Sequence, residues 1–179
     1  MKKIFRLAGG IIGAELTAIF LSFVLILFLG GLTDKIGITG IISALMYFGA
    51  VYSVGWNQGR RDSRNITGIH PDMKSNALAA LLCSGITLVL LIFRVAVFHI
   101  AAGGVVSADR PGILIAADVI YRLWNFPFIN FMQSGTLFSY ALPVFYPFAI
   151  YTAAYFLGVK RFSISEKILP DVIYRKKHD

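Results

Sequence analysis

Four long apolar stretches constrain the fold of this chain more than any other feature of its sequence. They cover residues 7–32, 36–56, 77–100 and 135–158. Each has about the 20 predominantly hydrophobic residues that an α-helix needs to cross a bilayer. Unpaired backbone groups are costly in lipid, so such stretches cross as helices. The sequence therefore predicts an all-α, polytopic membrane helix bundle with about four transmembrane helices.

The composition agrees with lipid as the solvent. Of the 179 residues, 57% are hydrophobic and only 15% are charged, and the mean hydropathy is +0.73. Too little polar sequence remains to cover a water-facing surface, and the chain is short enough for one domain. We therefore expect a single transmembrane domain over residues 1–179.

The basic residues predict how the chain is oriented. With four crossings, 13 of the 17 lysines and arginines fall on one side of the membrane: Lys2, Lys3, Arg6, Arg60, Arg61, Arg64, Lys74, Lys160, Arg161, Lys167, Arg175, Lys176 and Lys177. The positive-inside rule then places both termini, the loop 57–76 and the tail 159–179 in the cytoplasm. We interpret the net charge of +8 as a topology signal and expect no nucleic-acid partner. The Met-Lys-Lys start and the lack of an organelle signal indicate a bacterial plasma membrane.

Residues 107–134 decide the number of crossings. Asp118, Arg122 and Asn125 recur at helical spacing on one face, and Asp118 and Arg122 form an i, i+4 pair of opposite charge. The sequence predicts an amphipathic helix at 111–124 that lies in the outer interface. The alternative is a fifth crossing, which would carry charged residues through hydrocarbon and move the basic C-terminal tail to the other side.

Glu15 interrupts the first apolar stretch. It lies about 13 Å along the helix from Arg6, so it should face protein or water rather than lipid. One interpretation is structural: a hydrogen bond to a neighbouring helix, or a contact with Arg60 or Arg61. The other is that Glu15 couples transport to a proton or cation. Small residues continue along the helix in an i, i+4 ladder that permits close packing: Gly10, Ala14, Ala18 and Ser22.

The segment Leu7-Ala-Gly-Gly-Ile-Ile-Gly-Ala-Glu15 resembles the first helix of small multidrug-resistance transporters. The resemblance implies a membrane glutamate that exchanges protons for cationic drugs. It covers about nine residues. Those transporters are shorter, have no long basic inner loop or outer amphipathic helix, and carry a tryptophan in the third span that is missing here. We therefore do not place the chain in that family.

Two further stretches contribute candidates for a coupling or substrate site. Arg94 in the third stretch can reach the outer surface or pair with Asp109 or Asp118, whereas its depth argues against a pair with Glu15. The last stretch contains Pro143 and Pro147, which predict a kink that frees backbone carbonyls, together with Tyr140 and Tyr151. A kinked, tyrosine-rich helix either lines a cavity or is a static bend.

The loop 57–76 contains the candidates for a cytoplasmic contact, namely Arg60, Arg61, Arg64 and Lys74. Such residues bind anionic lipid head groups or a protein partner, or they only set the topology.

Enzymatic motifs are missing from the sequence. One cysteine, Cys83, permits neither an intrachain disulfide nor a cysteine-ligated zinc site. The chain has no Gly-x-Ser-x-Gly, His-Glu-x-x-His or phosphate-loop pattern. We expect no metal and no cofactor. The only candidates for a membrane enzyme are Asp109, Asp118, Arg122 and His99 near the outer surface.

The sequence favours a non-enzymatic accessory or interaction subunit that acts through membrane or cytoplasmic protein contacts. The alternative is a small proton- or cation-coupled transporter that uses Glu15 and works as a homo-oligomer. A membrane enzyme is the third interpretation. In each case we expect the protein to contact a bilayer with anionic head groups.

Overall fold

The structure, a computed structural model, describes residues 1–29, 36–63, 72–103, 112–132 and 136–160, and it has no strand within these ranges. Its helices are α1 (Lys2–Leu29), α2 (Ile36–Ser63), α3 (Met73–Gly103), α4 (Gly112–Trp124), the short 3-10 helix η1 (Phe126–Phe128), α5 (Ile129–Met132) and α6 (Leu137–Val159). The predicted all-α helix bundle is confirmed.

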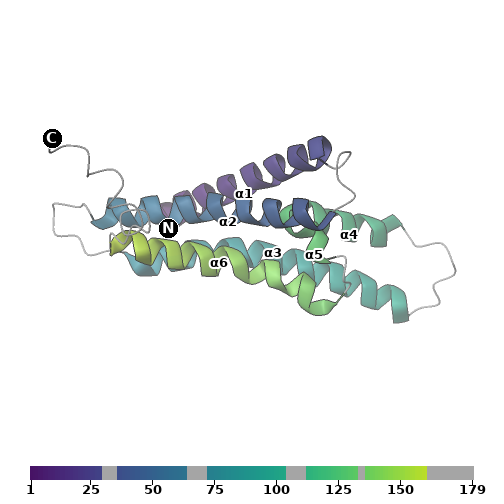
Figure 1. Cartoon of the computed structure of the whole chain (residues 1–179). Coiled ribbons are helices and arrows are strands. Elements are labelled where there is room, and N and C mark those ends of the chain that lie inside the picture. Colours follow the sequence, from purple (N-terminus) through teal and green to yellow (C-terminus); the bar gives the residue numbers. More distant parts are fainter. Residues whose placement is uncertain (30–35, 64–71, 104–111, 133–135, 161–179) are drawn as a thin grey trace.

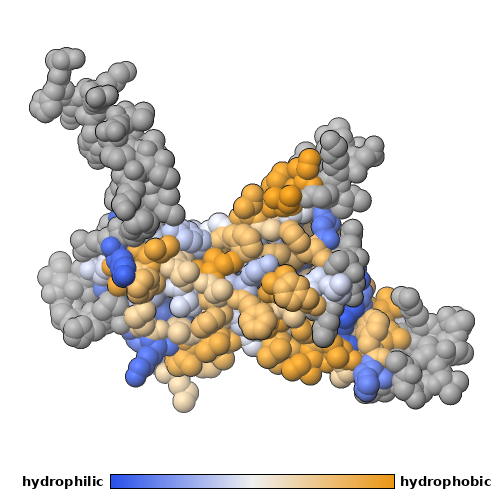
Figure 2. All heavy atoms as spheres, turned by 60° about the horizontal axis from the view of Figure 1, so that its bottom comes forward, coloured by the Kyte–Doolittle hydropathy of each residue, from blue (hydrophilic) through white to orange (hydrophobic). Residues whose placement is uncertain are grey.

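Four of these helices are long and apolar enough to cross a membrane: α1, α2, α3 and α6, with candidate spans of 22 to 27 residues. They run lengthwise in one bundle (Figure 1). The face shown in Figure 2 has hydrophobic residues over its middle and hydrophilic residues towards its two ends. Large exposed side chains such as Phe20, Val89 and Phe145 are suited to contact with lipid.

Contacts between helices define the two ends of the bundle. Lys3 of α1 pairs with Asp72, just before α3, and Tyr155 of α6 contacts Asp62 of α2. We call this the N-terminal end. At the other end, which we call the α4 end, Arg94 of α3 pairs with Asp118 of α4. The first and last long helices therefore have their free ends at the same end of the bundle, as four crossings require.

Several helix boundaries differ from the sequence prediction, and two of them affect the predicted loop 57–76. We placed the end of the second span at residue 56, but α2 continues through Ser63, so part of the predicted loop 57–76 is helical. We started the third span at residue 77, but α3 begins at Met73. Asp72 caps this helix, because the Ser75 N–H donates to its carboxylate over 3.0 Å.

Glycines explain why α2 extends so far beside α6. A Cβ on Gly55 would lie 2.7 Å from the Tyr151 carbonyl oxygen, and one on Gly59 would overlap the Tyr155 carbonyl oxygen. From the other side, a Cβ on Gly158 would overlap the carbonyl of Trp56. Glycines one turn apart allow two helix backbones to approach closely. Gly59, which lies in the predicted loop 57–76, is therefore a packing residue between α2 and α6.

The predicted amphipathic helix is confirmed as α4, whose described residues begin at Gly112. It lies lengthwise against α3 and runs antiparallel to it, since Asp118 contacts Arg94 and Trp124 donates to Thr87 over 3.0 Å. An interfacial helix was expected to lie across the ends of the long helices. Instead, α4 lies along α3. Whether it lies at the membrane interface stays a prediction.

The chain turns back after α4. Between α4 and the unit formed by η1 and α5 the axis bends by 91°. Asp118, before the bend, and Tyr140, after it, both contact Arg94. Described residues on both sides of the bend therefore contact the same arginine at the α4 end.

Pro143 and Pro147 are fully buried within α6, which continues as one helix from Leu137 to Val159. The kink that we expected from them stays a prediction.

Candidate functional site: a buried glutamate between two polar clusters

Glu15 is the one charged side chain that the described part of the chain buries almost completely, with 3% of its surface exposed. The Tyr47 hydroxyl of α2 donates a hydrogen bond to its Oε1 over 3.0 Å. Its Oε2 is buried and has no hydrogen-bond partner among the described residues, and no ion pair involves this carboxylate there. Glu15 thus faces protein, as predicted, but only half of its carboxylate is satisfied.

Three of the long helices also bury small polar side chains. Ser22 of α1, Ser43 of α2 and Ser84 of α3 are all buried, and their hydroxyls also have no described hydrogen-bond partner. Cys83 packs between α1 and α3, with its Sγ 3.7 Å from the Ala8 carbonyl oxygen. These three hydroxyls, like Glu15 Oε2, are therefore buried with spare hydrogen-bonding capacity.

An aromatic cluster of Tyr47, Phe48, Phe128 and Tyr146 packs against the same interior. The Phe128 ring, which comes from η1, lies 4.9 Å from the Tyr47 ring and 5.0 Å from the Tyr146 ring between centroids. Tyr47 thus contacts Glu15 with its hydroxyl and the aromatic cluster with its ring. The short helix η1 therefore packs against the ring of the tyrosine that bonds Glu15.

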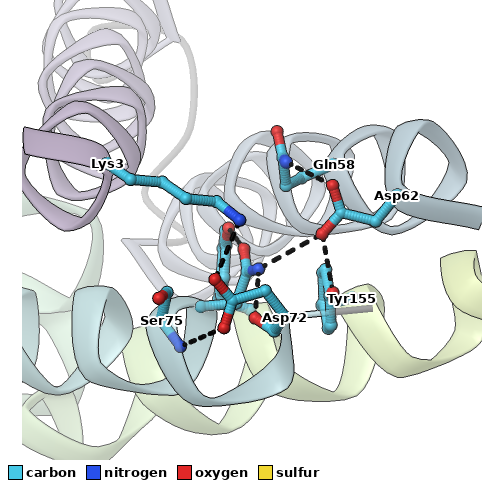
Figure 3. A network of polar contacts seen from close by, with 8 residues as sticks. Lys3, Gln58, Asp62, Asp72, Ser75 and Tyr155 are labelled. Atoms are coloured by element: carbon cyan, nitrogen blue, oxygen red, sulfur yellow. Dashed lines mark hydrogen bonds and ion pairs between the residues drawn. The ribbon is translucent and has the colours of Figure 1, made fainter. Parts of the chain in front are cut away.

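A polar cluster at the N-terminal end connects α2, α3 and α6 (Figure 3). The Asp62 carboxylate accepts hydrogen bonds from Gln58 over 2.9 Å, from Tyr155 over 2.7 Å and from Asn76 over 3.5 Å. Asn76 in turn accepts a hydrogen bond from the Tyr151 hydroxyl over 2.7 Å. Because Asn76 belongs to α3 and Tyr155 to α6, the Asp62 carboxylate of α2 connects three helices at this end of the bundle.

Lys3 ties α1 to this end of the bundle. Its ammonium group donates to Asp72 over 2.9 Å, and both side chains are partly exposed. The hydrogen bond from Lys3, followed by the one from the Ser75 backbone, lowers the pKa of Asp72 to about 2.

A second polar cluster at the α4 end connects α3, α4 and α6. Asp118 pairs with Arg94 and with Arg122, each over 2.7 Å. The Arg94 guanidinium lies 3.9 Å from the centre of the Tyr140 ring, and Arg122 donates to the Tyr140 hydroxyl over 2.9 Å. The Tyr121 hydroxyl donates to the Tyr140 backbone carbonyl. The predicted pair of Asp118 with Arg122 is confirmed, and of the alternatives considered for Arg94 the structure shows the pair with Asp118.

A cavity of about 480 Å³ lies at the N-terminal end between α1, α2 and α6. Its wall includes Gly10 of α1, which precedes Glu15 by five residues, or about 7.5 Å along the helix. Ile11, which follows Gly10 in the chain, is fully buried. The cavity therefore extends from the basic residues at the N-terminal end towards Glu15, which is not one of its lining residues.

The structure brings together only some of the candidates chosen from sequence. Arg94 and Tyr140 are in contact at the α4 end, whereas Tyr151 belongs to the N-terminal cluster and Glu15 contacts neither group. The interpretation that Glu15 hydrogen-bonds a neighbouring helix is confirmed, with Tyr47 as the partner.

The basic candidates at the N-terminal end are dispersed. Arg60 stacks on the Trp56 ring at 4.6 Å from its centre. Arg61 lines the cavity, and Lys74 is exposed. Arg64, Asp109 and the tail residues 161–179 lie outside the described residues.

Sequence reasoning missed the residues that complete these sites. Tyr47 was not chosen as a site candidate, although it carries a hydroxyl group in the middle of an apolar stretch. Asp62 and Asn76 were taken as loop residues, so they were never considered as a pair across two helices. Their position just beyond the predicted span ends was the available signal.

Comparisons with known proteins add no assignment. No protein-family model matches the chain, and neither a curated protein nor a solved structure matches it. Within the described ranges, no group of three or more His, Cys, Asp or Glu side chains is placed to hold a metal ion. The apolar long helices nevertheless indicate a membrane protein.

Proposed function

We propose that this protein is a small proton- or cation-coupled membrane transporter in which Glu15 binds the coupling ion. The observation that carries the proposal is the Oε2 atom of Glu15, which is buried without a partner beside a satisfied Oε1. A bound proton would make Oε2 a hydrogen-bond donor, and a bound cation would neutralise the carboxylate. Ionisable residues inside a membrane typically mark such pathways.

The surroundings of Glu15 support exchange of an ion with one end of the bundle at a time. The cavity approaches Glu15 from the N-terminal end, while Phe128 and Tyr146 close the other side. The polar clusters at the two ends each join three helices by hydrogen bonds and ion pairs. Switching between such contacts is how secondary transporters alternate access to a central site.

The test is ion-coupled flux in proteoliposomes. The vesicles contain a pH-sensitive dye and have an acidic interior. Tetraphenylphosphonium, which serves as the monovalent organic cation, is then added to the outside. We expect wild-type protein to release protons when the probe is added and Glu15→Gln to abolish the response. Thr17→Val, on the exposed side of α1, is the matched control and should behave as wild type. Equal proton fluxes through wild-type and Glu15→Gln vesicles would contradict the proposal.

The second candidate is the accessory or interaction subunit favoured by the sequence. The supporting observation is positive charge at the N-terminal end that the described chain does not neutralise, at Arg61 and Lys74. Reversing Arg60, Arg61 and Arg64 to glutamate should remove proteins that co-purify in mild detergent. An unchanged set of co-purifying proteins, together with an unchanged phenotype, would eliminate this candidate.

A further inference from the structure

The cavity at the N-terminal end has a polar part and an apolar part. Its lining comes from three helices: Arg6, Leu7 and Gly10 of α1, Ser53, Val54, Asn57, Gln58 and Arg61 of α2, and Tyr151 of α6. Two guanidinium groups, two amides and two hydroxyls therefore share a space of about 480 Å³ with aliphatic side chains. This volume is typical of a small-molecule site.

Some basic residues at this end have an acidic or aromatic partner within the described chain, and others do not. Lys3 pairs with Asp72, Arg60 stacks on Trp56, and Lys160 lies 4.4 Å from the centre of the Phe156 ring. Arg6 and Arg61 have no acidic or aromatic partner within the described ranges, and both line the same cavity.

The acidic groups near the cavity do not cancel these two charges. Asp62 is the closest in sequence, but it accepts hydrogen bonds from Gln58, Tyr155 and Asn76 and forms no ion pair with a described arginine. None of the described residues that line the cavity is acidic, so the described lining carries a net positive charge.

We propose that this cavity binds the phosphate group of an anionic phospholipid, with Arg6 and Arg61 as its charged ligands. Arginine suits this role because its planar guanidinium offers two parallel N–H donors to phosphate oxygens. Asn57 supplies a further amide donor at the wall. Leu7 and Val54 give the glycerol and upper acyl chain an apolar surface.

The position of the cavity favours a lipid over a soluble phosphate. Arg6 is in the second turn of α1 and Arg61 in the last turn of α2, where both apolar spans end. Head groups lie at this level when the spans cross a bilayer, and a lipid there presents its phosphate at high local concentration. The proposal does not depend on Glu15 or on transport.

The site is connected to the N-terminal cluster. Gln58 and Tyr151 line the cavity and also hydrogen-bond Asp62 and Asn76. A bound head group therefore contacts the side chains that hold α2, α3 and α6 together, so lipid binding should also stabilise this end of the bundle.

Lipid retention, measured by native mass spectrometry, tests the site. Protein is exchanged into detergent containing defined ratios of phosphatidylglycerol and phosphatidylcholine. We expect wild type to retain phosphatidylglycerol, and Arg6→Gln with Arg61→Gln to bind it roughly 30-fold more weakly, or about fivefold for each lost charge. The matched control, Arg60→Gln with Lys74→Gln, removes the same charge from the same end but leaves the cavity intact, and it should bind as wild type.

Three outcomes overturn the proposal. Equal losses in the double variant and the control would reduce the effect to general surface charge. Equal affinity for the two lipids would remove the role of anionic charge. Displacement of phosphatidylglycerol by millimolar inorganic phosphate would assign the site to a soluble anion.

If the double variant does not fold, Ser53→Trp provides a second test, because it fills the cavity while keeping both arginines. It should cause the same selective loss of phosphatidylglycerol, and unchanged lipid retention in this variant would contradict the site.

Discussion

Tyr47 donates a hydrogen bond to one carboxylate oxygen of Glu15 over 3.0 Å, while the other oxygen of Glu15 is buried with no described partner. The two residues come from α1 and α2, which are neighbours in the bundle. This contact gives Glu15 one fixed bond and leaves one position open. The transport proposal depends on that asymmetry.

Removal of the Tyr47 hydroxyl should destabilise the protein. Tyr47→Phe leaves both Glu15 oxygens unsatisfied in the interior, and we expect a loss of about 1–3 kcal/mol in the free energy of unfolding. The measurement is reversible unfolding in mixed micelles. Tyr52→Phe, a partly exposed tyrosine on the same helix, is the control and should change little. Wild-type stability in Tyr47→Phe would show that the hydrogen bond does not form.

Glycine-to-alanine substitutions in α2 should have opposite effects at two positions. Gly59→Ala places a Cβ against the Tyr155 carbonyl of α6, so it should force the helices apart and destabilise the bundle. Gly49→Ala meets nothing within 4 Å and should be neutral or stabilising by up to about 1 kcal/mol, because alanine favours the helix. Melting temperatures of the two variants provide the measurement. The reverse order would be incompatible with the packing of α2 on α6.

The pair of Arg94 and Asp118 should contribute more to stability than an exposed ion pair. The two side chains are 14% and 23% exposed, and Asp118 also holds Arg122. A double-mutant cycle with Arg94→Gln and Asp118→Asn should give a coupling energy above the ~1 kcal/mol typical of surface pairs. A coupling near zero would mean that α4 is not fastened to α3 by this pair.

The contribution of Lys3 and Asp72 should depend on pH in the acid range. Their contact lowers the pKa of Asp72 to about 2, below its usual value of 3.8. A lowered carboxyl pKa stabilises the fold above the unfolded pKa, and the contribution disappears as the pH falls from about 4 to about 2.

Asp72→Asn keeps a helix-capping side chain but removes the charge, so it isolates this effect. Wild type should exceed the variant in stability at neutral pH, by less than ~1 kcal/mol because both side chains are partly exposed. The two curves should meet near pH 2. A constant difference across this range would contradict the ion pair.

Much of the fold could be predicted because the apolar stretches specify helices, and the basic residues specify their orientation, without any knowledge of how the helices pack. The four long helices, the helix at α4, the inward direction of Glu15 and the pair of Asp118 with Arg122 all follow from local spacing and from the cost of charge in lipid. The pair of Arg94 with Asp118 was predictable only as one of several options.

The rest depends on how the helices are rotated and how far they extend. Tyr47 meets Glu15 because α2 turns that face towards α1, which no spacing in either helix specifies. Asp62 and Asn76 lie 14 residues apart across a predicted loop, and they meet only because α2 continues to Ser63 and α3 begins at Met73. The cavity lined by Arg6 and Arg61 likewise depends on α6 packing closely at Gly55.

Infrared difference spectroscopy of the protein in lipid gives the most direct test of ion binding at Glu15. As the pH is titrated, the account predicts a protonated-carboxyl band that appears in wild type, is missing in Glu15→Gln and shifts in frequency in Tyr47→Phe, since the hydroxyl bonds the same carboxylate. A titration spectrum that is identical in wild type and Glu15→Gln would contradict the account.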